Sequence, residues 1–157
     1  MDAKLNLNNF IAIDPGPENC GYCMFNDGRP IDWGNIGVED MLTMIEESDI
    51  ITHETPIVIE MITSYGMKVG QTTFDTCVVI GRIQELANRM GYTHVKIPRR
   101  VVRSTLKKKN DKEIRAFCIE KYGEFGASGH SWQACGLGIT FMEIYSESGL
   151  KKGRKIK

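Results

Sequence analysis

The chain has 157 residues, of which 41% are hydrophobic and 25% are charged. This length and balance are typical of one globular domain with its own core. Lysine and arginine together number 20, as do aspartate and glutamate, so the formal net charge is zero. A neutral total excludes a protein that is basic all over, although a local basic stripe can still bind nucleic acid.

The sequence predicts neither a membrane protein nor a secreted one. No apolar run is long enough to cross a membrane, and residues 1–9 lack the charged-then-apolar order of a signal peptide. The five cysteines are Cys20, Cys23, Cys77, Cys118 and Cys135. Cys20 and Cys23 form a CxxC, but this spacing places them on opposite faces of a strand. We therefore expect buried, reduced thiols, with structural zinc or redox chemistry as the less favoured alternative.

The first third of the chain predicts strands joined by short turns. Three strands are expected over residues 10–14, 21–25 and 31–36, and Asp27-Gly28 is a hairpin signal between the last two. An amphipathic helix over residues 38–47 is followed by the strand Ile57-Val58-Ile59-Glu60-Met61. A strand–helix–strand order predicts a parallel crossover, which brings this strand near the first.

A long helix is predicted over residues 71–90, and its apolar residues form two stripes. One stripe can cover the sheet, and the other needs a second cover. We expect the second stripe to be a dimer interface, with a neighbouring helix of the same chain as the alternative. The residues assigned to this interface are Phe74, Cys77, Val78 and Gly81.

The remaining sequence predicts one strand and three helices. The strand covers residues 93–97, and a short helix begins at Pro98. Asp111 is the expected N-cap of a helix that runs to about Tyr122, and the final helix covers residues 131–145. Nothing resembles a linker, so we expect a single domain over residues 1–148. A basic tail over residues 149–157 is expected to be disordered.

Two of the predicted strands each carry one acid in an apolar run. Asp14 ends the first strand, where Pro15 and Gly16 break it, and Glu60 lies near the end of the fourth. A carboxylate is costly to bury unless it is paired or binds a metal. A turn-capping role for Asp14 is the alternative. Together the two acids favour one shared metal site at the carboxyl ends of the strands.

Several motifs follow one another along the chain: Ile13-Asp14-Pro15-Gly16, Gly21-Tyr22, Val58-Ile59-Glu60, Asp111-Lys112 and His130-x-x-Gln133-Ala134. In this order they resemble the RuvC family of Holliday junction resolvases, in particular the short members encoded by bacteriophages. The resemblance implies an α/β, ribonuclease H-like fold with a mixed five-stranded sheet flanked by helices. It also implies a homodimer that cuts branched DNA with Mg²⁺ or Mn²⁺, in the cytoplasm of a bacterial or bacteriophage-infected cell.

By the same resemblance the catalytic residues are Asp14, Glu60, His130 and Gln133, and the first three are metal ligands. His130 and Gln133 are three residues apart, so they share one face of a helix start. A capping or packing role is the alternative for His130. The family usually has an aspartate where Gln133 stands, so this site lacks one negative charge.

A basic stretch between residues 96 and 112 predicts contacts with DNA phosphates. A merely solvated basic face is the alternative. The loop after Glu60 suits insertion of an apolar side chain between bases, with loop packing as the alternative for Tyr65. The residues expected to contact DNA are Tyr65, Met67, Lys68, Arg99, Arg100, Arg103, Lys107, Lys108, Lys109 and Lys112.

The sequence therefore favours a metal-dependent endonuclease that cuts Holliday junctions or branched DNA. One alternative is a junction-binding protein of the same fold that has lost catalytic power. The other is a phosphotransferase of the actin-like fold, for which the chain is too short to hold a second domain. A labelled four-way junction with added metal separates these functions, because nicks indicate a nuclease and a shifted band without nicks indicates a binder.

Overall fold

The computed structural model of the protein describes residues 5–64, 66 and 68–146. The strands are β1 (Asn9–Pro15), β2 (Asn19–Asn26), β3 (Arg29–Gly37), β4 (Ile57–Met61) and β5 (His94–Pro98). The helices are α1 (Val38–Glu47), α2 (Gln71–Met90), α3 (Arg99–Leu106), α4 (Asp111–Tyr122) and α5 (His130–Tyr145). The predicted tail at 149–157, Tyr65 and Met67 lie outside the described residues. No helix among the described residues is long and apolar enough to cross a membrane.

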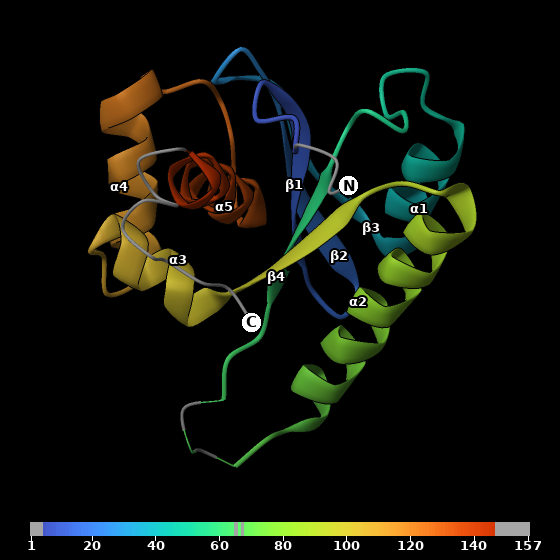
Figure 1. Cartoon of the computed structure of the whole chain (residues 1–157). Coiled ribbons are helices and arrows are strands. Elements are labelled where there is room, and N and C mark those ends of the chain that lie inside the picture. The colour runs from blue at the N-terminus through green and yellow to red at the C-terminus, as the bar shows by residue number, and fades with distance from the viewer. Residues whose placement is uncertain (1–4, 65, 67, 147–157) are drawn as a thin grey trace.

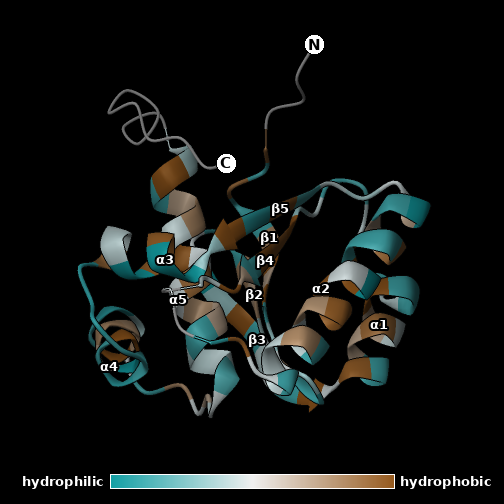
Figure 2. Ribbon diagram, turned by 90° about the horizontal axis from the view of Figure 1, so that it is seen from below, coloured by the Kyte–Doolittle hydropathy of each residue, from teal (hydrophilic) through white to brown (hydrophobic). Residues whose placement is uncertain are grey.

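The strands form one mixed sheet in the order β3-β2-β1-β4-β5. Helices α1 and α2 cover one face, and α3, α4 and α5 cover the other, as Figure 1 shows. Figure 2 presents the same three layers from below. This arrangement confirms the predicted α/β fold with a mixed five-stranded sheet. The predicted hairpin is also confirmed, since Asp27 and Gly28 both have positive φ, 56° and 78°.

Strand β1 is central, antiparallel to β2 and parallel to β4. Ile13 of β1 pairs with Ile59 of β4, so the next residues along the two strands are Asp14 and Glu60. The prediction that the two acid-bearing strands lie side by side is therefore confirmed.

Alternation along β1 divides the core into two parts. Phe10 and Ala12 pack in the core beneath α3, α4 and α5, whereas Ile11 and Ile13 pack in the core beneath α1 and α2. Asp14 follows Phe10 and Ala12 in this alternation, and Glu60 follows Val58, which belongs to the same core. Both acids are thus directed to the face of the sheet that carries α5.

Helix α5 is the principal cover of that face. Eleven of its 16 residues are buried, so it is apolar almost all round and must be packed on several sides. Phe10 stacks on Phe25 of β2 with ring centroids 4.8 Å apart, and meets Phe141 of α5 edge-on at 4.7 Å. A side chain at Gly138 would collide with the Phe25 ring, so α5 lies directly against β2. This packing fixes where α5 begins.

Two local predictions need correction. The N-cap of α4 is Asn110, not Asp111, because the Asn110 side chain accepts a hydrogen bond from the Glu113 backbone N–H at 3.0 Å. Asn and Asp cap helices about equally well, so the sequence alone does not separate two adjacent candidates. Cys77 is exposed, whereas the other four cysteines are buried as expected, and all five are free.

Cys20 and Cys23 lie on opposite faces of β2, as their spacing predicts. Cys20 packs in the core beneath α1 and α2, and Cys23 packs in the core beneath α5.

Candidate functional site

Asp14 and Glu60 lie at the carboxyl ends of two adjacent strands, and both are buried. Asp14 is 1% exposed and Glu60 is 4% exposed. Burial of two neighbouring carboxylates is unfavourable, because each disfavours the charged form of the other. Burial, together with the Asp14 charge, raises the pKa of Glu60 to about 7 although Arg99 opposes the shift. This pair of acids therefore requires positive charge nearby.

Arg99 supplies much of that charge. It is the first residue of α3 and follows directly on β5, the strand beside β4. Its Nε donates to Oε1 of Glu60 at 2.6 Å, and its Nη2 lies 3.8 Å from Oδ1 of Asp14. Burial alone would lower the pKa of Arg99, but the ion pair with Glu60 outweighs burial and raises it. Arg99 was assigned to DNA from sequence, and its position between the two acids was not foreseen.

His130 reaches Asp14 from the start of α5. Its Nδ1 lies 2.8 Å from Oδ2 of Asp14, and its side chain is half-exposed. This hydrogen bond raises the pKa of His130 despite the opposing effect of burial. The two oxygens of Asp14 therefore differ, because Oδ2 is bonded to His130 whereas the buried Oδ1 has no hydrogen-bond partner.

Gly21 allows His130 to come this close. It lies on β2 and pairs with Asp14 in the sheet. A Cβ at Gly21 would collide with the backbone carbonyl group and the Cβ of His130. The sequence contains this signal as the motif Gly21-Tyr22, but the reason for the glycine is visible only when α5 is placed over the sheet.

Gln133 makes its hydrogen bond to the chain at the start of α4. Its Nε2 donates to the backbone oxygen of Asp111 at 3.2 Å, so the side chain is directed toward α4. It lines a pocket of about 350 Å³ together with His130, Lys112 and Arg115. Arg115, which lies 5.8 Å from the centre of the Trp132 ring, was not singled out from sequence. The catalytic role of Gln133 stays a prediction.

Asp14 and Glu60 have the ligand chemistry that a divalent metal prefers, but one oxygen of each is already hydrogen-bonded. Carboxylate oxygens are preferred ligands of Mg²⁺ and Mn²⁺, and the buried, unpartnered Oδ1 of Asp14 is an atom that a cation would satisfy. Within the described residues, however, no three His, Cys, Asp or Glu side chains are grouped so as to hold a metal ion. Arg99 is bonded to one of the two Glu60 oxygens that such an ion could use.

The predicted basic stretch forms α3 and its connection to α4. The exposed cations are Arg100, Lys107, Lys109 and Lys112. Lys108 is half-buried, with its Nζ 5.6 Å from the centre of the Phe117 ring. Arg103 lies 3.6 Å from Asp111. Lys68 is exposed on the loop after β4, away from this stretch in the sequence. The assignment of these residues to DNA stays a prediction.

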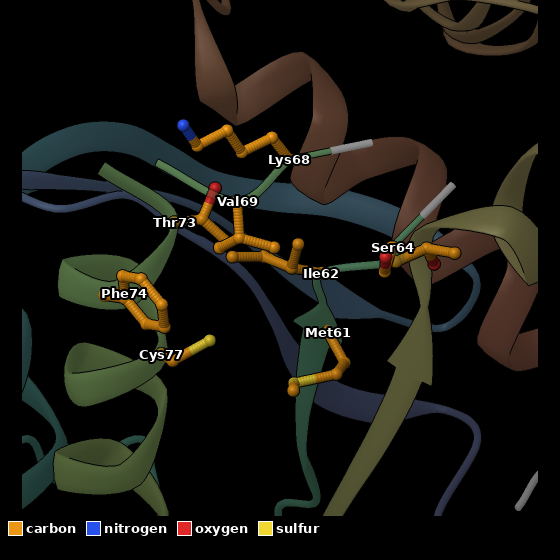
Figure 3. A pocket seen from close by; sticks show the side chains of 9 residues that line it. Met61, Ile62, Ser64, Lys68, Val69, Thr73, Phe74 and Cys77 are labelled. Atoms are coloured by element: carbon orange, nitrogen blue, oxygen red, sulfur yellow. The ribbon is translucent and has the colours of Figure 1, made fainter. Parts of the chain in front are cut away.

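The second stripe of α2, formed by Phe74, Cys77, Val78 and Gly81, is exposed. Phe74 is 57% exposed and Val78 is 63% exposed. The stripe adjoins a largely apolar pocket of about 360 Å³, where Figure 3 shows Phe74 and Cys77 projecting from α2 beside Met61 at the end of β4. Large exposed apolar side chains gathered on one helix are typical of an interaction surface.

The comparisons with solved structures agree with this architecture. A mixed five-stranded sheet between helices, with acids at the carboxyl ends of its central strands, defines a ribonuclease H-like fold. A structure of RuvC from Thermus thermophilus in complex with Holliday junction substrate is 11% identical, with a TM-score of 0.67 over 89% of this chain and 97% of that chain. A second Thermus thermophilus RuvC structure is 14% identical, with a TM-score of 0.67 over 86% of this chain and 94% of that chain. The protein thus has the RuvC type of ribonuclease H-like fold, as the motifs predicted. No family model and no curated protein matches the sequence.

The replacement Gly21→Ala should separate His130 from Asp14, because the new Cβ would occupy the place of the His130 backbone. The pKa of His130, measured by NMR, should fall toward its ordinary value, and overpacking should lower the free energy of unfolding by about 1–3 kcal/mol. Gly70→Ala is the control, since nothing lies within 4 Å of a Cβ at Gly70. An unchanged His130 pKa in Gly21→Ala would show that Gly21 does not set this contact.

Proposed function

We propose that the protein is a metal-dependent endonuclease that cuts Holliday junctions or other branched DNA as a homodimer. The observation that carries this proposal is the buried pair of Asp14 and Glu60, placed side by side at the carboxyl ends of β1 and β4. Open α/β sheets bind their ligands at this edge. The branched substrate is supported by the Thermus thermophilus RuvC of the same fold, which is bound to a Holliday junction substrate.

Asp14 and Glu60 would hold Mg²⁺ or Mn²⁺, and His130 would serve either as a further ligand through Nε2 or as a base, but not as both. Such an ion, when bound, stabilises charge on the phosphate and lowers the pKa of the attacking water. Of the two Asp14 oxygens, Oδ1 is the one that has no hydrogen-bond partner and would be open to such an ion.

His130 is suited to move a proton. Its Nδ1 bonds to the Asp14 carboxylate, and a carboxylate can only accept, so Nδ1 carries the hydrogen. In the neutral ring Nε2 is then a base, and the half-exposed side chain can reach a water or a phosphate oxygen at the surface.

The basic stretch would hold DNA phosphates beside this site. Helix α3 begins at Arg99, which contacts the acids, and the exposed cations Arg100, Lys107, Lys109 and Lys112 follow it along the chain. Lys112 also lines the same pocket as His130, so a phosphate bound there would lie next to His130, which bonds to Asp14. Contacts of this kind position a duplex without reading its sequence.

The exposed stripe of α2 would join two copies of the chain. Gly81 is exposed and has nothing within 4 Å of its Cβ position, so a second helix can approach closely there. Two copies related by a twofold axis would present two sites to the two strands that must be cut.

A junction-binding protein without catalytic power is the second candidate. It is favoured by Gln133, which carries no charge and bonds to the backbone of Asp111. The actin-like phosphotransferase gains no support, because the described residues form a single sheet with its covering helices.

The replacements Asp14→Asn and Glu60→Gln should each abolish cleavage of a labelled four-way junction in Mg²⁺ or Mn²⁺. Junction affinity in a gel-shift assay should stay the same or increase, because a negative charge that repels phosphate is removed. Asp49→Asn, an exposed acid outside the site, is the control. Cleavage by Asp14→Asn at the wild-type rate would refute the metal-dependent mechanism.

Replacement of Lys107, Lys108 and Lys109 together by alanine should weaken junction binding and flatten its dependence on salt. The slope of log K against log salt should fall by up to about 2.7 if all three lysines contact phosphates. Arg29→Ala, at the hairpin between β2 and β3, is the control for loss of a distant charge. A slope equal to that of wild type would remove this stretch from the DNA surface.

The replacement Gly81→Arg should give a folded monomer. An arginine has room in the single chain, but in a close interface it would bury an unpaired charge that costs about 3–5 kcal/mol. Analytical ultracentrifugation should show dimer association weaker by at least about 100-fold. Ala116→Arg, on an exposed position of α4, should leave association unchanged. Equal association of wild type and Gly81→Arg would place the interface elsewhere.

A further inference from the structure

The contact between Arg99 and the acids has a consequence for metal binding. Arg99 donates to Oε1 of Glu60 at 2.6 Å, a short charge-assisted hydrogen bond, and approaches the unpartnered Oδ1 of Asp14 at 3.8 Å. These two oxygens belong to the two proposed metal ligands. The guanidinium therefore occupies the same electrostatic position, between two buried carboxylates, that a divalent ion would take.

A guanidinium and a divalent ion repel each other, so the two compete for the same pair of carboxylates. Arginine remains charged under all ordinary conditions, so it cannot leave by losing a proton. It can leave only by moving, and its position permits this. The Arg99 side chain is 34% exposed, whereas the carboxylates beneath it are 1% and 3% exposed. A long side chain that starts at the first residue of a helix and is partly in water can turn outward while the acids stay in place.

We propose that Arg99 is a positioning residue that competes with the divalent ion for Glu60 and so sets the metal affinity of the site. This inference rests on the proposed metal site. Arg99 relieves the repulsion between Asp14 and Glu60, and a divalent ion must displace its bond to Glu60 before it can bind both acids. Metal binding is thus weaker than two buried carboxylates alone would give.

The test measures Mn²⁺ binding by isothermal titration calorimetry without DNA. Arg99→Gln keeps much of the side-chain volume but removes the charge. It should bind Mn²⁺ at least about tenfold more tightly than wild type, as expected for loss of a unit charge near the ligand oxygens. Arg89→Gln is the matched control. It removes the same charge from the last turn of α2, which precedes the amino end of β5 and so lies at the opposite edge of the sheet. Affinity in Arg99→Gln that equals or falls below that of wild type overturns the inference.

Displacement itself has a signature that a purely structural role would not give. In ¹⁵N NMR of the wild type, the Arg99 Nε–H should be protected from solvent exchange before metal is added. Mg²⁺ should remove that protection as it saturates the site, and Asp14→Asn should need more Mg²⁺ for the same change. Persistent protection at saturating Mg²⁺ overturns the inference. If Arg99→Gln does not fold by circular dichroism, Arg99→Lys replaces it, since a single ammonium keeps the charge but loses the planar fork that spans both acids. Arg99→Lys should also bind Mn²⁺ more tightly than wild type, and equal or weaker binding overturns the inference.

Failure of this inference and failure of the proposed function are distinguishable. If the wild type cuts junctions but Arg99→Gln binds Mn²⁺ with unchanged affinity, the competition by Arg99 is refuted and the nuclease proposal stands. If Arg99→Gln binds Mn²⁺ more tightly but the wild type cuts no junction, the competition is supported and the proposed nuclease activity is refuted. Absence of Mn²⁺ binding in both proteins overturns the metal site and the competition together.

Discussion

Two carboxylates buried next to each other repel, and the neighbouring strands of this sheet leave Asp14 and Glu60 no way to separate. Two neighbouring side chains stabilise the pair against that repulsion. Arg99 comes from the end of β5 through α3, and His130 comes from the start of α5. Both helices begin at the same edge of the sheet, where the carboxyl ends of the parallel strands meet. The ion pair of Arg99 and the hydrogen bond of His130 therefore both stabilise the same pair of acids.

The position of α5 depends on contacts between small and aromatic residues. Gly138 lets the helix lie against Phe25, and Gly21 lets its first residue reach the sheet beside Asp14. Phe10 links β1 to both β2 and α5 through its contacts with Phe25 and Phe141. The hydrogen bond of His130 to Asp14 is thus a result of core packing along the whole helix, and not only of local capping at its start.

Much of the fold was predictable, because strands and helices here have clear periodicity and turn residues. The two acids were also predictable, since each is a single charged residue in an apolar strand. Arg99 was different. In the sequence it is one of several cations, and only the pairing of β4 with β5 places it on Glu60 rather than on the surface. Gln133 likewise has the expected spacing from His130, yet its amide finds a partner in the backbone of Asp111, which no periodicity reveals.

The exposed apolar face of α2 was predictable, because its sequence has two apolar stripes. One stripe can pack on the sheet, and the other then has no cover within the single chain. Cys77 belongs to this second stripe, so it is exposed in the single chain whereas the other four cysteines are buried. The N-cap of α4 was missed by one residue for lack of any local signal that separates Asn110 from Asp111.

The sheet keeps two sets of elements apart. Helices α3, α4 and α5 share one core, and α1 and α2 share the other, with β1 and β4 contributing alternate residues to both. Strand β2 contributes alternate residues to both cores as well, so changes on α2 can reach the core beneath α5 through all three of these strands. A partner bound to the exposed surface of α2 would therefore meet the side of the sheet opposite to α5.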